Sequence, residues 1–96
     1  MCKSQIIARI MEVVTKETEV PEEYIRSGSK KVEVVDAKCI AIKLLSEQGL
    51  YPDQIAKYMN MTSSSVRHLL GEYSTRCCQN KILAIYAQNI RKILAA

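Results

Sequence analysis

The chain has 96 residues, of which 48% are hydrophobic and 25% are charged, with three glycines and two prolines. This composition is that of a folded protein rather than a disordered tail, so we expect a single domain over residues 1–96. No segment approaches the roughly 20 apolar residues that a membrane span requires, and the N-terminus lacks the layout of a signal peptide. We therefore expect a cytoplasmic protein with no membrane partner.

The positive charge is concentrated in the second half of the chain. Residues 1–48 hold eight Lys or Arg and eight Asp or Glu, whereas residues 49–96 hold six Lys or Arg and two Asp or Glu. The whole excess of +4 therefore lies in the second half. This asymmetry favours a polyanionic partner.

The residues typical of metal sites and catalysis are sparse. Cys2, Cys39, Cys77 and Cys78 show no C-x-x-C spacing, and we expect reduced thiols and no bound metal or cofactor. Ser65 and His68 are three residues apart on an expected helix, but we expect no acidic residue beside them to orient the histidine. The sequence therefore does not predict an enzyme.

Apolar residues at helical spacing predict an all-α fold. A first helix is expected from Ser4, as its N-cap, to about Thr18. A short helical turn with Pro21 at its first position follows, and residues 27–31 form a loop that carries Lys30 and Lys31. A long central helix then ends before Gly49; its β-branched start, residues 32–35, could instead be a strand, but no partner strand is predicted.

Three more helices are expected in the second half, which makes a bundle of about five to six helices. Pro52 opens a helix that runs to about Met59, and Thr62 is placed to cap the next one. A final helix begins near Asn80.

Residues 52–70 have the spacing of a helix-turn-helix. Ala56 is small where the two helices would cross, Asn60 tolerates the left-handed backbone of a tight turn, and Val66 packs back between the helices. The alternative is an ordinary helical hairpin whose serines only cap and solvate a helix.

The exposed side of the second helix carries groups that hydrogen-bond to bases and phosphates. Duplex DNA is the partner that this pattern predicts, because a hydroxyl-rich helix start can approach the major groove closely. Lys57 on the preceding helix and the two loop lysines are candidates for phosphate contacts. Taken alone, Lys30 and Lys31 are more typical of a solvated loop. The expected DNA-binding residues are Lys30, Lys31, Lys57, Thr62, Ser63, Ser64, Ser65, Arg67 and His68.

The chain resembles the C-terminal duplex-DNA-binding domain of the bacterial chromosomal replication initiator, DnaA, from about Ile6 to Leu94. The family's "R-x-x-A-M-x-L" pattern is similar to Lys-Cys-Ile-Ala-Ile-Lys-Leu at residues 38–44, and its "L-x-E-I-G" helix is similar to Asp-Gln-Ile-Ala at residues 53–56. The family signature "R-D-H-[ST]-T-V-x-H" falls on residues 61–68, where Ser64, Ser65, Val66 and His68 follow it.

This resemblance implies a Trp-repressor-like helix-turn-helix bundle, with the recognition helix in the major groove and the basic loop in the adjacent minor groove. It also implies a role in replication initiation or its regulation, whereas a transcriptional regulator or a mobile-element protein would look the same in sequence. Met61, Thr62 and Ser63 replace the family's Arg, Asp and His, and no G-x-x-x-x-G-K-[ST] loop of an ATPase is present. A protein-interaction domain that keeps the fold without reading DNA is the alternative function.

Overall fold

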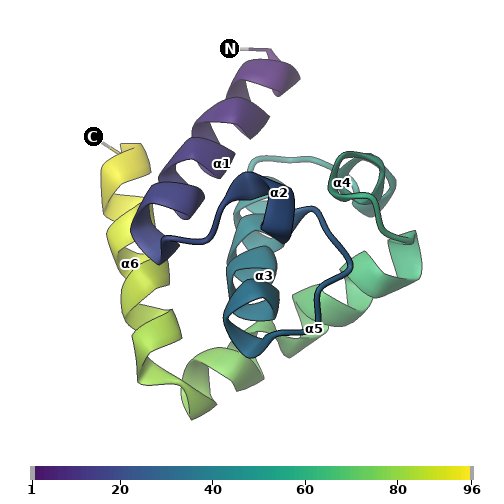
Figure 1. The fold of residues 1–96 in the computed structure, drawn as a ribbon. Helices are drawn as coiled ribbons and strands as arrows, with labels where there is room; N and C mark the ends of the chain where they lie inside the picture. Colours follow the sequence, from purple (N-terminus) through teal and green to yellow (C-terminus); the bar gives the residue numbers. More distant parts are fainter. Residues whose placement is uncertain (1, 96) are drawn as a thin grey trace.

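The computed structural model describes residues 2–95, which form six helices and, within that range, no strand (Figure 1). The all-α prediction of about five to six helices is confirmed. The helices are α1 (Lys3–Thr18), α2 (Glu22–Ile25), α3 (Val32–Glu47), α4 (Pro52–Met59), α5 (Ser63–Gln79) and α6 (Lys81–Ala95).

Helix α3 is the centre of the fold, with α1, α2, α4 and α5 packed around it (Figure 1). Ile40, Ala41 and Leu45 of this helix have no solvent exposure. Residues 32–35 are helical rather than extended, since Val34 is buried in the shared core. No described segment offers these residues a strand to pair with, so the helix is the only regular structure open to them.

Two predicted helix starts differ from the structure. Helix α1 begins at Lys3 and its N-cap is Cys2, whose backbone N–H donates to Gln5 Oε1 at 3.2 Å. Gln5 thus satisfies the free amide, and Ser4 lies inside the first turn, so the prediction of Ser4 as the cap is wrong. Pro21 is the N-cap of α2 rather than its first residue, with extended ψ of 146°.

The bounds of α4 and the start of α5 lie where they are predicted. Helix α4 begins at Pro52, and Asn60 ends it in the left-handed conformation, with φ 62° and ψ 41°. Thr62 caps α5, since its Oγ1 accepts the Ser65 backbone N–H at 3.1 Å. Val66 is fully buried, which fixes the start of α5 against the core.

Helix α6 closes the bundle by packing on α1 and α5 (Figure 1). The break before it is at Asn80, which is extended and whose side-chain oxygen accepts the Ile82 backbone N–H at 3.1 Å. Within residues 2–95, no helix combines the length and the apolar character needed to span a bilayer.

Candidate nucleic-acid interface

The hydroxyl groups at the start of α5 do not all face solvent freely. Ser63 donates its hydroxyl to Asp53 Oδ1 at the start of α4, so it ties the two helices together. Thr62 caps the helix and its hydroxyl also donates to Ser65 Oγ at 2.9 Å. Ser64 is exposed, and no hydrogen bond of its hydroxyl is found within residues 2–95. Ser64 is therefore the serine best placed to meet a ligand.

Arg67 and His68 are both exposed on the next turn of α5, but their surroundings differ. His68 Nε2 contacts Glu72 Oε1, four residues later, and the His68 side chain is 73% exposed. The expectation that no acidic residue orients His68 is therefore wrong, because a residue at i+4 lies directly above it on a helix. No carboxylate in residues 2–95 pairs with Arg67, whose guanidinium is left to solvent.

Serine hydroxyls order the basic loop between α2 and α3. Ser27 Oγ donates to Tyr24 O at 2.6 Å and accepts the Ser29 N–H at 3.2 Å. The Ser29 hydroxyl in turn lies 3.4 Å from the backbone N of Lys31. These bonds hold a short loop in one path, and Lys30 and Lys31 are exposed along it.

A shallow groove of about 440 Å³ joins this loop to the front of α5. The structure thus brings together side chains from three of the predicted groups. They are Lys30 of the loop, Ser64 and Ser65 at the start of α5, and His68. The lining residues are Gly28, Ser29, Lys30, Val35, Lys38, Met61, Ser64, Ser65, His68 and Leu69.

Lys38 is a cation in this groove that the sequence reasoning did not include among the site residues. It lies on the buried side of α3, is 8% exposed, and its Nζ donates to Ser27 O at 2.6 Å. Burial lowers its pKa, and no carboxylate of residues 2–95 forms an ion pair with it. The sequence could have indicated Lys38, because it stands at a core position of its helix. A lysine is rarely buried without a specific role or partner.

Lys31 and Lys57 lie outside the groove lining. Lys31 is the N-cap of α3, and Lys57 is exposed in the last turn of α4. Both are exposed, but neither contributes to the wall of the groove.

The chain matches no protein-family model. It also matches no curated protein.

Proposed function

We propose that this protein binds duplex DNA through a helix-turn-helix, with α5 as the recognition helix in the major groove. The proposal includes a Trp-repressor-like arrangement similar to the C-terminal domain of DnaA, and it makes replication initiation or its regulation the expected process. It is supported by the α4–turn–α5 geometry, in which a left-handed Asn60 and a capping Thr62 set up an exposed helix start.

The single observation that carries the proposal is the groove between the basic loop and α5. Lys30 and Lys38 contribute positive charge to this groove, and the outward hydroxyl of Ser64 can donate to an anionic oxygen. A Lys38 ammonium without a carboxylate partner is costly to hold at this depth, and a phosphate oxygen would supply the missing charge. A DNA backbone entering here would place the base edges under the first turns of α5.

Acidic neighbours narrow the set of side chains that would read bases. Asp53 engages Ser63, and Glu72 engages His68. Ser64 and Arg67 then remain as the outward groups of the first two turns. Arg67 is the candidate for a bidentate contact to guanine, and the lysines are candidates for phosphate contacts that carry no sequence information.

Selection of bound duplexes from a random pool tests this proposal, followed by affinity measurements on the enriched sequence. Arg67→Ala should weaken binding to that sequence by about 1–3 kcal/mol and relax its base preference at one position. Lys30→Ala should weaken binding to all duplexes alike, since phosphates are common to every sequence. No enriched motif, together with equal small losses for both variants, would leave only non-specific attraction.

The alternative is a protein-interaction domain that keeps this fold without reading DNA. It is favoured by the carboxylates that already engage Ser63 and His68 on the proposed DNA-binding face of α5. A stoichiometric protein complex that is insensitive to salt and to Arg67→Glu would select this alternative over DNA binding.

A further inference from the structure

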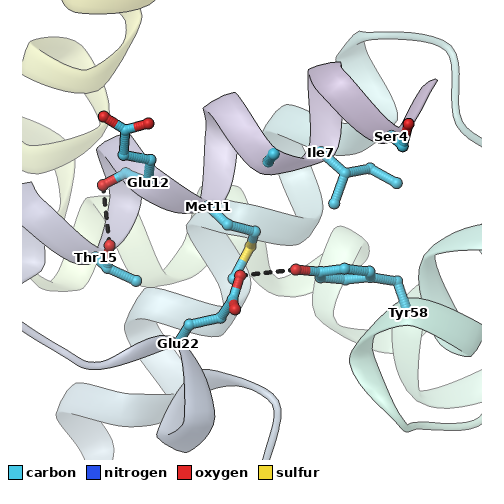
Figure 2. Close-up of a pocket in the computed structure, with 8 residues that line it drawn as sticks. Ser4, Ile7, Met11, Glu12, Thr15, Glu22 and Tyr58 are labelled. Carbon is cyan, nitrogen blue, oxygen red and sulfur yellow. Dashed lines mark hydrogen bonds between the residues drawn. The ribbon is translucent and has the colours of Figure 1, made fainter. Parts of the chain in front are cut away.

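A second groove lies away from the basic loop, between α1 and the α2 and α4 helices (Figure 2). It has a volume of about 480 Å³ and follows one face of α1 from Ser4 to Thr15. Ile7 and Met11 project from α1 toward Tyr58 of α4 and form its apolar wall (Figure 2). The groove is open along its length, which suits a helix laid into it better than an enclosed small molecule.

The rim of this groove is acidic. Glu22 accepts the Tyr58 hydroxyl on Oε1 at 2.7 Å, which leaves Oε2 for a second donor, and Glu12 lines the same groove. No lysine or arginine is among the lining residues. Arg26 stacks over the Tyr58 ring at 4.5 Å, but the charged side chains that line the groove itself are carboxylates, which favour a positively charged, partly apolar ligand.

The outward face of α6 has the complementary chemistry. Its isoleucines Ile82, Ile85 and Ile93 are 60%, 53% and 40% exposed. Lys81 and Lys92 are exposed on the same helix, and α6 contains no Asp or Glu. From Ile82 to Ile93, this face extends about 16 Å at the α-helical rise, and the face of α1 from Ser4 to Thr15 has the same length.

We propose that the α1–α4 groove binds the outward face of α6 from a second copy of this chain. Lys92 of one copy would pair with Glu22 of the next, while the isoleucines cover the partly exposed Ile7 and the exposed Ala8. Helix α1 lies between α6 and the helices α2 and α4 (Figure 1). Because α2 and α4 form the other side of the groove, the α6 of one copy cannot fill its own groove. The contact is therefore head-to-tail, and it leaves a free groove at one end of each assembly and a free α6 at the other.

Sedimentation equilibrium of the protein without DNA tests this proposal over a range of concentration. We expect the average mass to rise with concentration at low salt and to fall back as salt screens the lysine–glutamate pairs. Glu22→Lys and Lys92→Glu should each weaken association at least about tenfold, since each replaces an attraction by a repulsion. The matched controls are Glu23→Lys and Lys30→Glu, which make the same charge changes outside the two surfaces and should associate like the unmodified protein.

Mixing the two interface variants gives the sharpest result. The intact α6 of the Glu22→Lys variant can enter the intact groove of the Lys92→Glu variant, so two samples that are monomeric alone should associate when mixed. Circular dichroism of each variant verifies its fold. A monomeric unmodified protein, association that survives Glu22→Lys, or a mixture that stays monomeric would each overturn the proposal. None of these results depends on whether the protein binds DNA.

Discussion

Single side chains at helix ends determine where the chain turns. Gln5 satisfies the amide of Cys2, and Thr62 accepts the amide of Ser65. Each removes one of the unpaired donors that every helix start leaves. The same hydroxyl types beside Thr62 behave differently, because Ser63 binds Asp53 and Ser64 points to solvent. A residue's role at this scale depends on which donor or acceptor lies within reach.

Removal of the Thr62 cap should therefore destabilise the fold. Thr62→Ala is expected to lower the free energy of unfolding by about 1 kcal/mol, because the Ser65 amide loses its acceptor. Chemical denaturation measures this change. Ser64→Ala is the matched control and should change stability by less than about 0.5 kcal/mol, as an exposed substitution does. Equal losses in both variants would show that Thr62 has no special capping role.

Tyr58 should make stability fall at high pH. Burial and the hydrogen bond to Glu22 raise the pKa of Tyr58 to about 12, above its ordinary value of 10.0. Between these values the folded state holds the phenolic proton and the unfolded state has lost it, so stability decreases as pH rises through this range. Denaturation at several pH values should show a shallower decrease for Tyr58→Phe; an unchanged slope would contradict this assignment.

At the scale of elements, the second half of the chain was the easier one to predict. Pro52, Asn60 and Thr62 each mark a boundary by a local backbone rule, and the structure places all three as predicted. The preference of serine for N-cap positions placed the start of α1 wrongly. The N-cap is Cys2, and the Gln5 side chain accepts its backbone N–H. The last turns of α5, to Gln79, carry few apolar residues and end only at an extended Asn80.

The candidate site could be predicted only in part, because some of its contacts depend on how the helices pack. Its exposed residues lie in short segments that sequence reasoning can identify one at a time. Lys38 joins them only because α3 passes beneath the basic loop and places its ammonium at Ser27 O. The Ser63–Asp53 contact likewise depends on how α4 and α5 cross, which spacing alone does not determine.

The turn between α4 and α5 depends on the backbone of Asn60. Asn60→Val should lower the melting temperature, because a β-branched side chain at φ 62° costs about 1–2 kcal/mol. Asn60→Gly should leave stability nearly unchanged, since glycine adopts this conformation freely. Thermal unfolding compares the two variants. A glycine variant as unstable as the valine variant would show that the asparagine side chain, rather than its backbone, holds the turn.

For the molecule as a whole, the charged side chains that line the two grooves are of opposite sign. Lys30, Lys38 and the exposed Arg67 accompany the basic loop and α5, whereas Glu12 and Glu22 line the groove of α1. The proposed functions assign DNA to the first side and a second copy of the protein to the other. Both sides depend on α3, which holds the loop, α1 and α5 around one apolar core.

Titration of a labelled duplex at increasing salt concentration tests whether α5 binds DNA. If about four to six phosphates contact the basic groups around α5, the logarithm of affinity should fall with the logarithm of salt concentration at a slope of roughly −4 to −5. Arg67→Glu should weaken binding at every salt concentration. Absence of duplex binding at low salt, or a slope near zero, would contradict the assignment of α5 as a DNA-binding helix.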